Sequence, residues 1–220
     1  MERQPDLRRL AIALLLAAAA VPLSALDSAP ANGTCEAIRA WAKENRQNLP
    51  KSYRGLLSFP LEQRRAIYAD LSPAEKSVFW TEKIAAYLAE HPELEAGQRQ
   101  AAAEVQAFLT ADVHALAAGP DSPAKTSMQN RLLAMAESVT ARLGEDHARR
   151  LLYGLGPAPA DVRRSEPRAS ERGRCNCWYM FDCTDPEDIC DELIDCLQPP
   201  FPICGPGAAM PCTGSCVPFG

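Results

Sequence analysis

Histidine and recognisable catalytic motifs are scarce in this chain. Three histidines occur among its 220 residues: His91, His114 and His147. None belongs to an H-E-x-x-H zinc motif, and the sequence contains neither a G-x-S-x-G nucleophile turn nor a P-loop. Acidic residues are numerous, but they are spread along expected helix faces that water would solvate. We therefore predict that the protein is not an enzyme and uses no cofactor, and that His114 and His147 lie on helix surfaces or accept hydrogen bonds in the core.

Strong net charge and repeated long apolar runs are also missing. The formal net charge is −5, so no overall basic field points to nucleic acid or to an anionic membrane. After residue 26 no apolar run approaches the roughly 20 residues that a membrane-spanning helix needs. These absences predict no nucleic-acid partner and no stable membrane span in the mature protein.

The single long apolar run lies close to the N-terminus. Residues 10–26 are rich in leucine and alanine and follow a start that contains three arginines. Small residues at positions 29–31 fit a signal-peptidase site, and positions 23–25 offer an alternative site. A membrane anchor is the competing interpretation, although the run is short for a span. We predict that residues 1–31 are a signal peptide and that the protein is secreted or periplasmic.

Residues 32–156 carry the apolar pattern of successive helices. The stripe of Trp80, Ile84, Tyr87 and Leu88 follows the i, i+4, i+7, i+8 spacing. Ser72-Pro73-Ala74-Glu75 is a strong helix start, because serine can cap, proline suits the first helical position and glutamate can reach back. The fold class predicted is an all-α helical bundle of five or six helices, followed by a small C-terminal disulfide-rich module.

Three more helices are predicted in the second half of this region. One contains the apolar stripe of Ala101, Val105, Phe108, Leu109 and Val113. The next begins at Ser122-Pro123 and stops at Gly144, since glycine commonly ends helices. A short last helix is expected around residues 146–153.

Residues 157–174 form an expected linker of different composition. The segment begins with alternating proline and alanine, and low hydrophobicity with high charge then favours disorder. Proteases cut such exposed segments, which predicts a processing site at the linker arginines. The alternative is that the arginines only keep a spacer soluble. These arginines are Arg163, Arg164, Arg168, Arg172 and Arg174.

The tail, residues 175–220, has no lysine or arginine at all. It contains seven acidic residues and so carries a formal charge of −7, whereas residues 32–174 hold 20 basic and 18 acidic residues. Eight of the nine cysteines of the chain lie in it, a density typical of disulfide-stapled exported modules. We predict disulfides among Cys175, Cys177, Cys183, Cys190, Cys196, Cys204, Cys212 and Cys216, in any of 105 pairings.

Other interpretations of the tail cysteines and acids are weaker. A zinc site is disfavoured because the paired C-x2-C knuckle is missing, and calcium is disfavoured because no EF-hand loop occurs, so no metal is predicted. Cys35 is the odd thiol and pairs with the tail or with another chain. Thr184-Asp185-Pro186-Glu187 is a capping box that predicts one helix inside the tail, stopped by the prolines at 199 and 200.

Two ordered sets of residues carry a resemblance to a known family. The first comprises Leu49-Pro50-Lys51-Ser52-Tyr53, Arg64-Arg65-Ala66-Ile67-Tyr68, Leu71-Ser72-Pro73-Ala74-Glu75-Lys76-Ser77, Trp80 and His91-Pro92-Glu93-Leu94. The second opens the tail with Cys175-Asn176-Cys177 and closes it with Pro211-Cys212-Thr213-Gly214-Ser215-Cys216. On these residues the chain resembles the bacteriocin fulvocin C-related proteins, which are exported bacterial proteins. The resemblance implies an antimicrobial role with the tail as the toxic or interacting peptide. It implies no task for the helical domain.

The expected function is therefore that of a secreted bacteriocin-like precursor. The helical domain would mask the tail, a processing protease would cut the linker, and the freed peptide would act on an unknown component of the target cell. The alternative is an uncleaved secreted protein whose tail is a binding or structural module. Inhibition of trypsin-like proteases is disfavoured, because the tail offers no basic residue for their specificity pocket.

Overall fold

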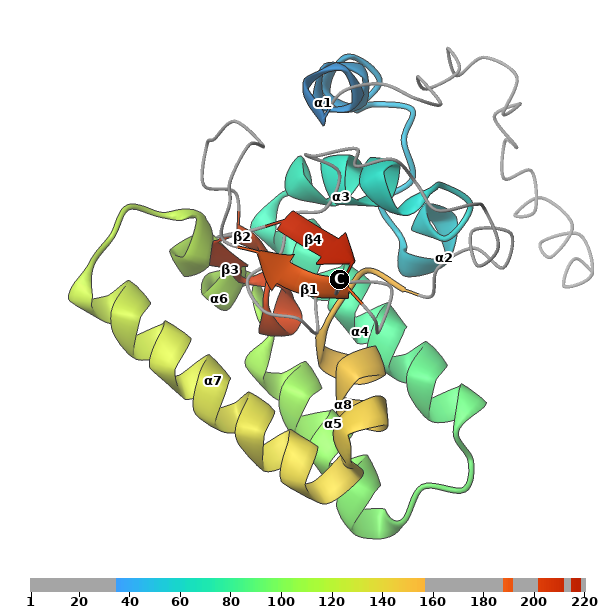
Figure 1. The fold of residues 1–220 in the computed structure, drawn as a ribbon, viewed down its shortest axis with the longest axis vertical. Helices are drawn as coiled ribbons and strands as arrows, with labels where there is room; N and C mark the ends of the chain where they lie inside the picture. The colour runs from blue at the N-terminus through green and yellow to red at the C-terminus, as the bar shows by residue number, and fades with distance from the viewer. Residues whose placement is uncertain (1–34, 157–187, 192–201, 212–214, 219–220) are drawn as a thin grey trace, which may run out of the picture.

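The computed structural model describes residues 35–156, 188–191, 202–211 and 215–218 (Figure 1). Residues 35–156 contain helices and no strand, which confirms the all-α prediction for this part of the chain. None of the helices in the described ranges has the length and apolar character needed to cross a membrane. The helices are α1 (Cys35–Glu44), α2 (Tyr53–Leu56), α3 (Leu61–Ala69), α4 (Pro73–Glu90), α5 (Ala96–Phe108), α6 (Ala111–Ala118), α7 (Pro123–Leu143) and α8 (Glu145–Leu152).

The predicted helix starts and stops are confirmed at α4 and α7. The Ser72 hydroxyl accepts from the Glu75 N–H at 3.3 Å, and the Glu75 carboxylate accepts from the Ser72 N–H at 2.8 Å. At α7 the Ser122 hydroxyl accepts from the Lys125 N–H at 3.2 Å. Gly144 ends α7 with φ of 81°, a left-handed conformation that favours glycine. Both helices therefore begin where their local capping signals predict.

Residues 35–156 hold eight helices instead of the five or six predicted. The stripe expected on one helix is divided, because α5 ends at Phe108 and Val113 lies in α6. At the break the Ser77 hydroxyl of α4 donates to the Leu109 carbonyl at 3.0 Å. The Thr110 hydroxyl then accepts from the Val113 N–H at 3.4 Å and caps the next helix. The break between α5 and α6 therefore coincides with a hydrogen bond from α4, which is distant in sequence.

The long helix α4 lies at the centre of the core. It contacts α2, α5, α6 and α8, and its Phe79, Trp80 and Ile84 side chains are fully buried. The Trp80 indole N–H donates to the Tyr68 hydroxyl at 2.9 Å. The Phe79 ring makes an edge-on contact with the Tyr68 ring, with centroids 5.1 Å apart. Aromatic side chains of α3 and α4 therefore form one buried, hydrogen-bonded cluster.

The described parts of the tail form two short antiparallel strand pairs. Strand β1 (Asp188–Asp191) pairs with β4 (Ser215–Pro218), and β2 (Pro202–Cys204) pairs with β3 (Met210–Pro211). A turn of 3₁₀-helix, η4 (Pro206–Ala208), joins β2 to β3. Figure 1 shows these elements in orange and red against the helical domain.

The helix predicted inside the tail is wrong at residues 188–191, which form β1. The backbone of this segment pairs with β4, and Ile189 lies opposite Val217 in the register. Both residues are β-branched and favour extended backbone. A local capping signal is a weak preference that long-range pairing overrides. The capping box itself lies outside the described residues.

Replacing Trp80 with alanine tests the aromatic core. Trp80→Ala should lower the free energy of unfolding by about 3–5 kcal/mol, because it leaves a cavity and removes the partner of the Tyr68 hydroxyl. Val78→Ala is the control on the same helix, since Val78 is 54% exposed and its loss should change stability by less than about 0.5 kcal/mol. Urea unfolding measures both. Equal effects would contradict the placement of Trp80 in the core.

Candidate functional site

The structure describes only some of the residues that the sequence singles out. Cys190, Cys204 and Cys216 lie in strands β1, β2 and β4, and Cys35 begins α1. The other five tail cysteines and the five linker arginines lie outside the described residues. The predicted processing site therefore stays a prediction.

The strand register brings two of the tail cysteines to the same level. Cys190 and Cys216 are direct partners in the antiparallel pairing of β1 with β4. Directly opposed residues of such a pair have Cα atoms about 4.5–5.5 Å apart. A disulfide spans Cα separations of about 4.4–6.8 Å. The backbone placement thus suits a bridge between these two positions.

Residues 205–210 of the tail are all buried, and they pack into the helical domain. Ala208, Ala209 and Met210 are at most 5% exposed and belong to the same hydrophobic core as Leu109 and Leu132. The turn η4 contacts α7 and α8, and β2 contacts α3. Part of the expected disulfide-rich module therefore completes the helical core.

The buried turn fits closely against Leu109. Gly207 has φ of 65°, and a Cβ on this residue would overlap Cδ2 of Leu109 and lie 3.2 Å from its Cδ1. Ala208 also has positive φ, of 46°, and its N–H donates to the Gly205 carbonyl at 3.1 Å. Only glycine allows the backbone to approach this closely. Residues 205–210 are uncharged and mostly small, and this composition could have predicted their burial. Sequence reasoning missed this signal.

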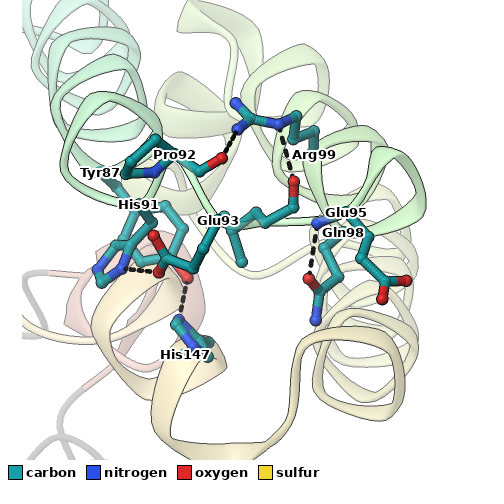
Figure 2. A network of polar contacts seen from close by, with 9 residues as sticks. Tyr87, His91, Pro92, Glu93, Glu95, Gln98, Arg99 and His147 are labelled. Atoms are coloured by element: carbon teal, nitrogen blue, oxygen red, sulfur yellow. Dashed lines mark hydrogen bonds and ion pairs between the residues drawn. The ribbon is translucent and has the colours of Figure 1, made fainter.

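Two of the three histidines meet between the end of α4 and α8 (Figure 2). The Tyr87 hydroxyl hydrogen-bonds to Nδ1 of His147 at 2.7 Å, and Nδ1 of His91 lies 2.8 Å from the Glu93 carboxylate. The His91 and His147 rings have centroids 5.0 Å apart. Burial raises the pKa of Tyr87 to about 12, so its hydroxyl stays protonated at neutral pH. Sequence reasoning missed this group because its members lie far apart along the chain.

The histidine group links α4 to α8. The hydrogen bond between Tyr87 and His147 joins these two helices, and Arg99 fixes the loop after α4 by donating to the Leu94 carbonyl at 3.0 Å. Within the described ranges, no group of three His, Cys, Asp or Glu side chains could hold a metal ion. We therefore interpret the group as a structural latch between α4 and α8.

Lys83 of α4 is buried beneath the C-terminal end of α8. It is 2% exposed, and its ammonium group donates to the carbonyls of Leu151, Tyr153 and Gly154 at 3.0, 3.3 and 3.0 Å. The same Nζ lies 4.1 Å from the centroid of the Trp80 ring. A cation at this end of a helix complements its unpaired carbonyls and its dipole. Burial lowers the pKa of Lys83 to about 7.

Other buried basic groups also bind backbone carbonyls. Arg64 is 2% exposed and donates to the Phe59 carbonyl at 2.6 Å and to the Leu57 carbonyl at 3.0 Å.

His114, predicted on a helix surface or as a core acceptor, is 2% exposed, and its Nε2 has no partner among the described residues. Burial, with a smaller contribution from nearby Lys76, lowers the pKa of His114 to about 4, so the imidazole is neutral at neutral pH.

Comparison of the chain with protein-family models, with curated proteins and with solved structures finds no match in any of the three. The function is therefore argued below from the residues and their geometry.

Replacing Lys83 tests its role under α8. The unfolded lysine has a pKa near 10.5 and the folded one near 7, so the unfolded chain binds more protons between these values. The free energy of unfolding contributed by Lys83 should therefore rise with pH over this window, by up to about 1.4 kcal/mol per pH unit.

Urea unfolding of the wild type and of Lys83→Met at pH 6, 8 and 10 measures this effect. Lys83→Met should be less stable throughout, because three carbonyls lose their donor, and the deficit should grow with pH. Lys43→Met, at an exposed position of α1, controls for the loss of one lysine. A deficit that shrinks as pH rises from 6 to 10 would contradict the assignment.

The strand register predicts a bridge between Cys190 and Cys216. Non-reducing peptide mapping of the protein produced under oxidising conditions should recover these two residues in one linked peptide, since their backbone positions are directly opposed. A Cys190→Ser variant should leave Cys216 open to alkylation, whereas the wild type should not be labelled there. Recovery of Cys190 linked to a different cysteine would contradict the prediction.

Proposed function

We propose that the chain is a secreted bacteriocin-like precursor in which the helical domain holds the cysteine-rich tail until the linker is cut. The observation that carries the proposal is the burial of residues 205–210 against the helical core. A segment in this position is covered by the domain that precedes it. The helical domain thereby acquires a task, which is to keep part of the tail out of contact with other molecules.

The distribution of basic residues supports the processing step. Five arginines lie in residues 157–174, and residues 175–220 contain no lysine or arginine. An arginine-directed protease would therefore cut the linker and leave the tail whole. Packed helices are poorer substrates, because cleavage there requires local unfolding.

The composition of the tail bears on how the peptide would act. Its formal charge of −7 argues against the electrostatic attraction to anionic membranes that cationic peptides use. The resemblance to the bacteriocin fulvocin C-related proteins supports the tail as the active part. We propose that the peptide recognises a specific component of the target cell and does not disrupt the bilayer.

An uncleaved secreted protein is the second candidate function. The same burial of residues 205–210 favours it, because a segment that completes the core is also expected in a permanently intact protein. In that case the rest of the tail would be a binding or structural module on the helical domain.

Cleavage followed by a growth assay separates the two candidates. Brief treatment with an arginine-specific protease without reductant should give the helical fragment and an acidic peptide that starts between residues 164 and 175. The peptide is separated in denaturant with its disulfides intact and returned to buffer. We expect it to inhibit growth of related bacteria, whereas the uncut protein is at least about tenfold weaker because part of the tail is covered.

A variant with all five linker arginines changed to glutamine is the matched control. It should resist cleavage in the linker and stay weak after the same treatment. An intact peptide that inhibits no member of a broad bacterial panel would remove the precursor proposal and leave the uncleaved binding protein in its place.

A further inference from the structure

The contact between the tail and the helical domain resembles the interior of one domain. Residues 205–210 are buried without exception, and Ala209 has no exposed surface. The core cluster to which they belong includes Leu132 of α7 and Leu151 of α8, and η4 contacts both helices. If the tail left, the helical domain would expose an apolar surface that is now covered, which opposes dissociation.

The shape of the contact adds specificity to this apolar burial. The backbone of Gly207 passes so close to the Leu109 side chain that no Cβ fits between them. Leu109 is itself fixed, since it is 1% exposed and its carbonyl accepts from the Ser77 hydroxyl. The helical domain therefore presents a preformed surface for one uncharged turn of small residues.

The described contact joins residues on both sides of the predicted cut: η4 lies against α7 and α8, and Gly207 lies against Leu109. Cutting residues 157–174 would remove the covalent connection and leave these described contacts in place. The formal charges of the two parts, positive before residue 175 and −7 after it, do not repel each other.

We infer that the helical domain is a binding domain for its own tail peptide, and that residues 205–210 keep the two together after the linker is cut. The inference rests on the proposed function for the cut itself. The product of processing is then a noncovalent complex of two fragments. Release of the peptide needs a second event, such as dilution. Free helical domain binds the peptide again and inhibits its activity.

Native size-exclusion chromatography of the cut protein tests the inference. The Cys35→Ser chain is used, so that no disulfide from residue 35 can link the fragments. After cleavage in the linker, the helical fragment and the peptide should elute together at micromolar concentration. They should separate in guanidinium chloride without reductant. Separate elution in native buffer would overturn the inference.

A pair of glycine variants identifies the contact. Gly207→Ala and Gly144→Ala both place a side chain at positive φ, of 65° and 81°, but only the first meets Leu109, whereas the second points into open space. Gly207→Ala should weaken the cut complex at least about tenfold, because overpacking a core contact is destabilising, and Gly144→Ala should change the dissociation constant much less. Equal dissociation constants for the two variants would overturn the assignment.

Two further measurements keep the outcomes distinct. Circular dichroism of the uncut variants establishes that the helices form, and Ala209→Glu provides a second disruption of the same contact, by burying a carboxylate. Growth inhibition is scored separately. A stable complex whose peptide inhibits no growth would contradict the proposed function but support the inference that the helical domain binds the tail. A peptide that inhibits growth but separates at once from the helical fragment would support the proposed function and contradict the inference.

Discussion

A buried lysine of the central helix holds the C-terminal end of α8. The last carbonyls of a helix have no donor within the helix, and burying them unpaired is costly. Lys83 of the central helix α4 donates to the carbonyl of Leu151 in the last turn of α8 and to those of Tyr153 and Gly154 just after it. Burial disfavours the charged form of Lys83, and its hydrogen bonds and its position over the face of the Trp80 ring offset part of that cost. The C-terminal end of α8 is therefore fixed to the centre of the core.

The α4–α8 junction also prepares the surface that the tail covers. His147, close to the start of α8, hydrogen-bonds to Tyr87 of α4, and Lys83 holds the opposite end, so α8 is attached to α4 at both ends. Helix α8 contacts η4, and Leu155 just after it is 1% exposed. Because α8 is fixed at both ends, it has few alternative positions. It therefore forms a well-defined surface for the turn at residues 205–210.

Local signals in the sequence predicted local structure well. The serine caps of α4 and α7, the Gly144 stop and the apolar stripe through Trp80 all lie where the sequence places them. Long-range contacts decided the rest. The Ser77 hydroxyl on Leu109 divides an expected helix, and pairing with β4 makes a strand of residues 188–191. The latch and the buried turn escaped prediction because their members are distant in sequence and because glycine and alanine carry no periodic signal.

The loss of the covalent connection determines how the tail would respond to a cut. The described contact consists of the buried turn at residues 205–210 and of β2 against α3. While the linker is intact, the tail faces its site at an effective concentration in the millimolar range, and a modest affinity keeps it bound. Once the linker is cut, occupancy follows the concentration of free fragments. In a proposed secreted precursor, cleavage would make the complex dissociable, and dilution outside the cell would then release the peptide. In this proposal, a noncovalent contact that depends on the linker for its high effective concentration would let one domain both protect the tail and release it.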